Sequence, residues 1–267
     1  YPEYRFIQSS AYHSEMLRRH YPRLFEMIQS KVAEGRYEPN GAVWVECDCN
    51  ITSGEFMIRQ MLWGQNFTRK YFNFTSNCLW MPDTFGYSAA IPQIMKGCHV
   101  DYFLTTKLSW NDTNKFPYEA FYWEGIDGTR VFTHFNSIHC WPDPETLIKS
   151  LEGRESENYL QNKRTVNKRL ISYGFGDGGG GPIFEMIEAA RRVRDLEGCP
   201  KAEHVMVGRF MEDMEREAVD PPVHQGELYL EMHRGTLTNM HNIKRNNRKA
   251  EFLIHDLELL TVKKAIT

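Results

Sequence analysis

Short apolar segments alternate with amphipathic ones along this chain, and that alternation is what most limits its fold. The pattern predicts strands at residues 41–45, 78–81, 102–105, 119–123, 130–135, 170–174, 205–207 and 228–230. It predicts helices at residues 12–35, 54–71, 88–96, 142–170 (one or two surface helices), 183–196, 209–217 and from Met240 to the end. Alternating strands and helices favour an α/β fold with a largely parallel sheet, either doubly wound or a partial barrel.

In both arrangements the chemistry belongs at the carboxyl ends of the strands. The first strand end with unusual side chains carries Glu46, Asp48 and Asn50 at alternate positions. Alternation places the three on one face, where they are either ordinary surface residues or the rim of a pocket.

A second strand end delivers Asp83 directly after Pro82, and Gly86 then permits a tight turn into the next helix. Asp83 is therefore either a helix cap or a functional carboxylate, and Ser88 is the better candidate for the cap.

The third unusual strand end is glycine-rich and presents Asp177 within residues 173–182. No Gly-Lys-Ser/Thr follows, and the acidic residue of a dinucleotide fingerprint is missing, so phosphate binding is disfavoured. An acid on a loop that approaches a ligand closely is the better interpretation. Asp83 and Asp177 together offer the two carboxylates that cleavage of a glycosidic bond needs.

The composition excludes several classes of protein. A net charge of −3 and a pI near 6.4 argue against nucleic acid as a partner. No apolar run reaches the ~20 residues of a membrane span. The six cysteines form no C-x-x-C pair, so we expect reduced thiols in a cytoplasmic protein. The opening Tyr1-Pro2-Glu3 suggests a truncated N-terminus.

Six motifs in order carry a family resemblance: WVECDCNITSGE, LWMPDTFGYSAAIPQIMKG, DYFLTTKLSWN, FYWEGIDGTRV, GFGDGGGGP and ELYLEMHRGTLT. Over essentially the whole chain they resemble the catalytic domain of glycoside hydrolase family 38 α-mannosidases, most of all the cytosolic and vacuolar branch. The resemblance implies an incomplete seven-stranded β/α barrel over residues 1–235. It also implies that residues 236–267 begin a three-helix bundle.

The resemblance also implies an activity and a set of site residues. Such enzymes release terminal α-linked mannose from oligosaccharides with retention, through a covalent mannosyl-enzyme. Asp83 falls at the nucleophile, which is also a metal ligand, and Asp177 is the candidate acid/base. Substrate-binding positions are expected at Lys107, His233, Trp44 and Asp48. Zinc or another divalent cation is the implied cofactor, and a homo-oligomer is the implied assembly of the full-length enzyme.

The chain departs from the family pattern in its metal ligands. The family's H-x-D motif is expected on a first barrel strand ahead of Tyr1, and His255-Asp256 lies in a helical pattern without the expected Pro-Gly turn. Asp83 is thus one of four expected ligands, and one carboxylate rarely holds zinc alone. We therefore expect this fragment to bind the metal weakly and to be inactive by itself.

Two other functions compete with the mannosidase hypothesis. A non-catalytic carbohydrate-binding module would use the aromatic residues, 13% of the chain, without needing two carboxylates. A metal-dependent deacetylase on a similar barrel would need histidine-rich motifs, which the sequence lacks.

Overall fold

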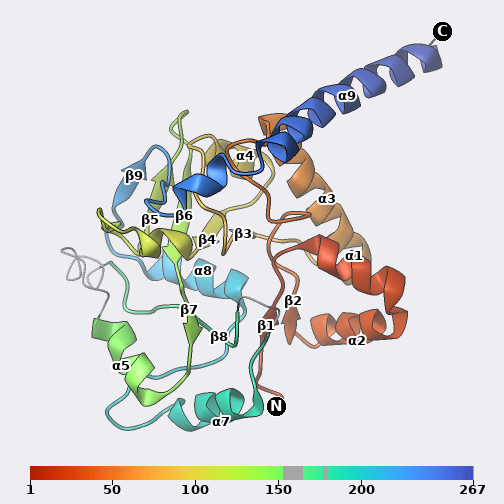
Figure 1. Ribbon diagram of the computed structural model, residues 1–267. Helices are drawn as coiled ribbons and strands as arrows, with labels where there is room; N and C mark the ends of the chain where they lie inside the picture. Colours follow the sequence, from red (N-terminus) through yellow and green to blue (C-terminus); the bar gives the residue numbers. More distant parts are fainter. Residues whose placement is uncertain (153–164, 177–179, 267) are drawn as a thin grey trace.

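A computed structural model describes residues 1–152, 165–176 and 180–266, and Figure 1 shows their arrangement. The strands are β1 (Phe6–Ile7), β2 (Tyr37–Glu38), β3 (Cys78–Trp80), β4 (Tyr102–Thr105), β5 (Ala120–Glu124), β6 (Arg130–Phe135), β7 (Ser137–Cys140), β8 (Ile171–Tyr173) and β9 (Val223–Gln225). The α-helices are α1 (Ala11–His20), α2 (Pro22–Ala33), α3 (Gly54–Phe72), α4 (Ile91–Gly97), α5 (Pro144–Glu152), α7 (Phe184–Val193), α8 (Val207–Glu217) and α9 (His241–Ile266). Two 3₁₀ helices are η1 (Lys107–Trp110) and η2 (Arg234–Leu237).

The largest sheet of the described chain has five strands in the order β3-β4-β6-β5-β9. Strands β3, β4 and β6 are parallel, with Leu79 beside Phe103 and Phe103 beside Thr133. Strand β5 is antiparallel to β6, and β9 is parallel to β5. Because β3 and β4 run in the same direction, their carboxyl ends meet at one edge of the sheet.

Both faces of this sheet are covered, as the apolar character of its strands predicts. Successive residues of a strand point to opposite faces. Leu79 and Phe103 therefore pack with α3 and α4, whereas Cys78 and Tyr102 pack with α8. The rings of Phe103 and Trp123, both fully buried, lie 5.0 Å apart in the first of these two clusters.

The start of α8 is held by a carboxylate from a distant segment. Glu38 accepts hydrogen bonds from the backbone N–H groups of Val207 (2.5 Å) and Gly208 (2.8 Å). These are two of the N–H groups that a helix leaves without partners at its N-terminus. Burial raises the pKa of Glu38. This contact joins β2 to α8 and so fixes the helix against the sheet.

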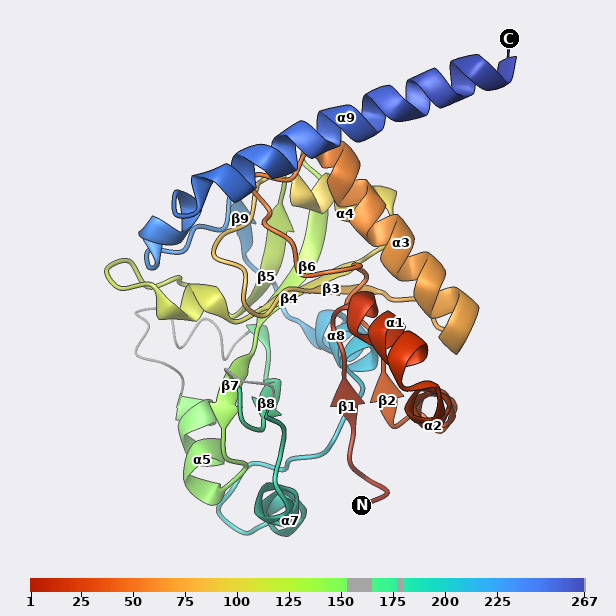
Figure 2. The same ribbon diagram turned by 45° about the vertical axis from the view of Figure 1, so that its right-hand side comes forward.

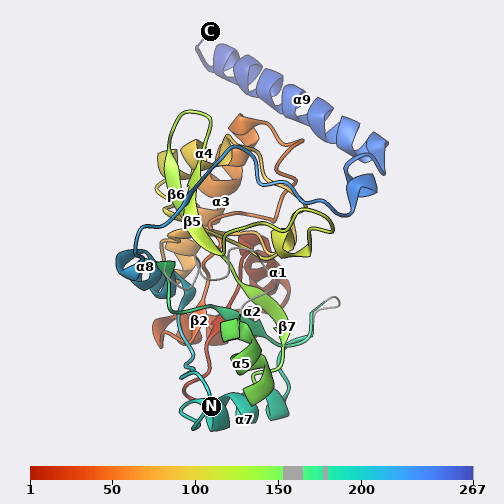
Figure 3. The same cartoon turned by 90° about the vertical axis from the view of Figure 1, so that its left-hand side faces the viewer.

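The remaining elements lie at two ends of the molecule. Helices α5 and α7 lie at the end that holds the N-terminus, and α9 runs past the opposite end (Figures 1, 2 and 3). Over most of α9 the side chains are exposed, and Glu251 is its buried residue. None of the described helices is long and apolar enough to cross a bilayer.

The structure confirms the α/β class and most predicted elements, including the hairpin of β5 and β6 and the long C-terminal helix. The strands of the described residues form three separate sheets, and the incomplete barrel and the bundle stay predictions. Cys47, Cys49, Cys78, Cys98 and Cys199 form no disulfide.

Some predicted elements were wrong. The predicted helix 12–35 is two helices, because Pro22 restricts Tyr21 to φ −136° and ψ 61°. Residues 41–45 and 228–230 make single bridges, Ser10 to Val43 and Tyr87 to Leu228, instead of ladders. Residues 205–207 lead into α8, and the ladder strand near the C-terminus is β9. Short apolar segments look alike whether they pair or merely pack.

Candidate active site

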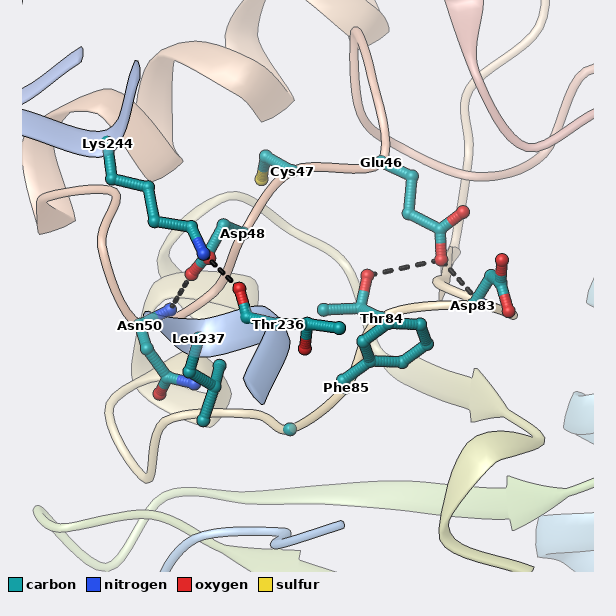
Figure 4. A pocket seen from close by; sticks show the side chains of 11 residues that line it. Glu46, Cys47, Asp48, Asn50, Asp83, Thr84, Phe85, Thr236, Leu237 and Lys244 are labelled. Atoms are coloured by element: carbon teal, nitrogen blue, oxygen red, sulfur yellow. Dashed lines mark hydrogen bonds between the residues drawn. The ribbon is translucent and has the colours of Figure 1, made fainter. Parts of the chain in front are cut away.

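Two loops and the start of α9 enclose a cavity of about 350 Å³ at the carboxyl end of β3 (Figure 4). Its lining consists of Glu46, Cys47, Asp48, Asn50, Asp83, Thr84, Phe85, Gly86, Thr236, Leu237 and Lys244. The alternating residues Glu46, Asp48 and Asn50 all line it, in agreement with the second of the two interpretations of this series, a pocket rim. The segment that carries them is an irregular loop and not the end of a strand.

Asp83 follows β3 and Lys107 follows β4, so the parallel pairing of these strands brings the two side chains together. Lys107 Nζ lies 2.5 Å from Asp83 Oδ1. The lysine side chain is 8% exposed, whereas the aspartate side chain is 60% exposed. The site thus presents an accessible carboxyl group beside a buried lysine.

Aromatic rings surround the Lys107 ammonium. Its Nζ lies 4.2 Å from the centre of the Trp110 ring and 5.2 Å from that of Phe85. Cation–π attraction stabilises a buried ammonium in such a position. The ring of His233 lies 5.0 Å from Phe85 and 6.3 Å from Trp110, so the predicted His233 does belong to this group. The rings offer the flat faces on which a sugar can stack.

Glu46 holds the loop that carries Asp83. Its Oε1 accepts hydrogen bonds from the backbone N–H of Asp83 at 2.5 Å and from the hydroxyl of Thr84 at 3.1 Å (Figure 4). Burial raises the pKa of Glu46. Sequence reasoning assigned Glu46 to the pocket rim but missed this link to Asp83. Only its position in the alternating series pointed to it.

Tyr87 fixes the same loop from inside the core. Its buried hydroxyl lies 2.8 Å from the carbonyl of Met81, 2.9 Å from that of Thr84 and 2.6 Å from the hydroxyl of Thr105. The loop between Met81 and Thr84 is thereby tied to the end of β4. A carboxylate held on both sides in this way loses little freedom when a ligand binds.

Asp48 and Trp44 occupy different surroundings. Asp48 lines the cavity, and its Oδ1 accepts the N–H groups of Asn50 (2.8 Å) and Ile51 (2.9 Å), which stabilises the turn. Trp44 lies outside the cavity lining, with its ring 5.9 Å from those of Tyr12 and Phe67. The structure therefore does not bring Trp44 to the other predicted residues.

The far wall of the cavity comes from η2 and α9, which sequence reasoning did not assign to the site. Lys244 donates a hydrogen bond to the carbonyl of Thr236 and lies across the cavity from Asp83 (Figure 4). No local pattern distinguishes this lysine from the other charges of the helix. Asp177, the predicted acid/base, lies outside the described residues.

The residues near Asp83 do not fit a zinc site by themselves. Among residues 1–152, 165–176 and 180–266, no three His, Cys, Asp or Glu side chains are grouped as metal ligands. His134 is buried, and both its ring nitrogens are engaged, with the Glu119 carbonyl (2.8 Å) and the Leu170 N–H (3.3 Å). Burial lowers the pKa of His134 to about 3, so it is neutral. His255 and Asp256 lie exposed on α9, as predicted.

With this geometry in place, comparison with known proteins identifies close relatives. The model of the glycosyl hydrolases family 38 N-terminal domain matches residues 1–227. Alpha-mannosidase G of Dictyostelium discoideum is 41% identical over 264 residues, which is 98% of this chain and 24% of that protein. Alpha-mannosidase 2C1 of Homo sapiens is 40% identical over 263 residues, 97% of this chain and 25% of that protein. The chain thus spans about a quarter of the length of these relatives.

Solved structures share the fold at lower sequence identity. An alpha-mannosidase from Enterococcus faecalis matches 85% of this chain and 26% of its own, with a TM-score of 0.67 and 19% identity. A 4-alpha-glucanotransferase from Thermococcus litoralis matches 83% of this chain and 33% of its own, with a TM-score of 0.54 and 12% identity. The fold is therefore shared by enzymes that are named for different activities.

Proposed function

Because this chain belongs to glycosyl hydrolase family 38, we propose that it forms part of a retaining exo-α-mannosidase that acts on terminal α-linked mannose. One observation carries the proposal: the exposed carboxylate of Asp83 lines a cavity at the carboxyl edge of β3 and β4 and is paired with buried Lys107. Both relatives are named alpha-mannosidases, which suggests the sugar, and mannose-containing oligosaccharides are the proposed substrates.

The proposed reaction has two displacements at the anomeric carbon of mannose. Asp83 attacks this carbon and forms an ester with it, while the glycosidic bond breaks and the leaving oxygen takes a proton from the acid, for which Asp177 is the candidate. Water then attacks the same carbon, gives its proton to the acid/base and releases both mannose and Asp83. Two inversions give net retention.

The surrounding residues suit these steps. Lys107 keeps the Asp83 carboxylate in one orientation through the 2.5 Å contact. Glu46 and Tyr87 hold the backbone on which Asp83 lies. Phe85 and His233 lie close together and offer a stacking surface for the sugar ring. Asp48 and Lys244 line the cavity and supply polar groups for its hydroxyls.

Zinc, or another divalent cation, is proposed as the cofactor of the longer enzyme, where it would bind hydroxyls of the sugar. Asp83 would be one ligand, and the others would come from sequence beyond the described residues. We accordingly propose that the 267-residue chain holds the ion weakly and is inactive alone. A cytoplasmic location and a homo-oligomeric assembly of the longer enzyme are likewise proposals.

Hydrolysis of an aryl α-mannoside, measured with added zinc or cobalt, tests this function. We expect turnover by a longer protein that carries the flanking sequence of its parent, and none by the 267-residue chain. In the longer protein, Asp83→Ala should lower kcat/KM by at least about 10³-fold, the loss typical of a missing nucleophile.

Asp101→Ala is the matched control, since Asp101 is also an exposed aspartate paired with a lysine but lies at the opposite end of β4. Its activity should stay within about twofold of the parent. Turnover by the 267-residue chain alone would overturn the proposed inactivity. Binding of mannosides without hydrolysis by either protein would favour a carbohydrate-binding module instead.

A further inference from the structure

Four sulfur atoms gather beneath the wall of the cavity. Cys47 Sγ lies 3.3 Å from Met57 Sδ, and Cys49 Sγ lies 3.6 Å from Met81 Sδ. The two pairs adjoin, because Cys49 Sγ also donates to the carbonyl oxygen of Cys47 at 3.6 Å. Three separate segments thus contribute to one group, which we call the sulfur cluster: Cys47, Cys49, Met57 and Met81.

Three members of the sulfur cluster are buried, and the fourth borders the cavity. Cys49, Met57 and Met81 are 4%, 2% and 0% exposed. Cys47 is only partly buried and lines the cavity (Figure 4). A small ion in the cavity therefore meets Cys47 first, with the other three sulfur atoms behind it.

The chemistry of the donors selects the kind of ion. Thiolate and thioether sulfur prefer soft cations, of which Cu(I) is the usual protein-bound example. Two sulfur ligands at about 2.3 Å from one tetrahedral ion lie roughly 3.8 Å apart. Within each of the two cysteine–methionine pairs, the observed separations of 3.3 and 3.6 Å are a few tenths of an ångström shorter than this. The carboxylates of Glu46, Asp48 and Asp83 line the approach and attract a cation.

We propose that Cys47, Cys49, Met57 and Met81 form a binding site for one soft monovalent cation, Cu(I) or Ag(I). Each thiol that coordinates releases one proton to solvent, and neither the ion nor sulfur changes oxidation state. The site is separate from the four-ligand zinc site of the family, because its donors are sulfur atoms of this chain. It does not depend on the mannosidase function.

The experiment is an anaerobic titration of the chain with Cu(I) in the presence of the chelator bicinchoninate. The chelator binds Cu(I) more tightly than a single thiol does, so only a site with several ligands can take the copper from it. We expect one equivalent bound per chain, detected as loss of the coloured bicinchoninate complex. Cys47→Ser and Cys49→Ser should each raise the Kd at least about 100-fold, since even an outer-shell change costs about 10- to 100-fold. Met57→Leu and Met81→Leu conserve volume, so the fold should persist while the Kd rises about 10-fold.

Cys98→Ser and Cys199→Ser are the matched controls, because both are partly buried free thiols outside the sulfur cluster. They should bind copper like the parent, and X-ray absorption of the bound copper should show sulfur neighbours alone. Unchanged binding by Cys47→Ser and by both methionine variants would overturn the proposal. The proposal would also be overturned if the amount of copper bound per chain fell equally with the loss of any cysteine. It would likewise be overturned if the parent bound no copper in the presence of bicinchoninate.

Discussion

Strand β4 has an aspartate–lysine pair at each end, and the two pairs have the same N···O distance but differ in the burial of the lysine. Lys96 contacts Asp101 just before the strand and Lys107 contacts Asp83 just after it, both at 2.5 Å. The aspartates are similarly exposed, at 52% and 60%. The lysines are not: Lys96 is 41% exposed and Lys107 is 8% exposed.

The difference lies in what surrounds each pair. Around Lys107 the structure places the rings of Phe85 and Trp110, and behind Asp83 it places the carboxylate of Glu46. Lys96 and Asp101 make an ordinary surface contact, of the kind that contributes about 0–1 kcal/mol. A distance alone therefore does not identify a site. Burial of one partner, with aromatic cover and a fixed loop, distinguishes the end of the strand that carries the candidate site.

The largest expected difference between the two ends concerns activity. In the longer protein, Lys107→Met should lower kcat/KM for an aryl α-mannoside by about 10²-fold or more, the usual cost of removing one preorganised electrostatic group. Lys96→Met should leave it within about twofold. Steady-state kinetics on both variants measure the contrast, and equal activities would show that the buried lysine has no role beyond packing.

A smaller effect should appear in how stability depends on pH, and it involves the carboxylate behind Asp83. Burial raises the pKa of Glu46 above its ordinary value of 4.5, so the folded chain binds this proton more tightly than the unfolded chain. The resulting contribution to stability is complete below pH 4.5 and is lost as the pH rises through the folded pKa. Its slope is at most about 1.4 kcal/mol per pH unit.

The glutamine in Glu46→Gln cannot titrate, so this variant should not lose stability as the pH rises through the folded pKa of Glu46. Its amide oxygen still offers an acceptor for the Asp83 N–H. Urea unfolding of the chain between pH 4 and 8 measures the difference. Glu55→Gln, on a side chain 56% exposed, is the control for losing a carboxylate and should follow the parent. A parallel pH dependence in the parent and Glu46→Gln would contradict the prediction.

The smallest effect should come from the outer pair itself. Asp101→Asn should reduce the free energy of unfolding by about 0.2–1 kcal/mol, as for exposed ion pairs, and salt should screen part of that change. Urea unfolding at low and high ionic strength gives both numbers. A loss well above this range would mean that the Lys96–Asp101 pair contributes more to stability than its exposure suggests.

The sequence by itself determined the residues at the centre of the site. The apolar segment ending in Pro82-Asp83 predicts a strand that delivers Asp83 to one edge of a parallel sheet, and the family resemblance supplied Lys107. The structure joins the two side chains at that edge. The alternation of Glu46, Asp48 and Asn50 allowed either surface residues or a pocket rim, and the structure places them at a cavity. Such predictions depend on local periodicity and chain direction, which a short stretch of sequence encodes.

Only the tertiary structure decided which distant groups meet at that edge. Glu46 contacts the backbone of a residue 37 positions away, Lys244 closes the cavity from another helix, and Trp44 packs away from it. The same packing left residues 41–45 without a ladder and brought Cys49 to Met81. These contacts follow from how whole elements fit together, which depends on the volumes and faces of many side chains at once.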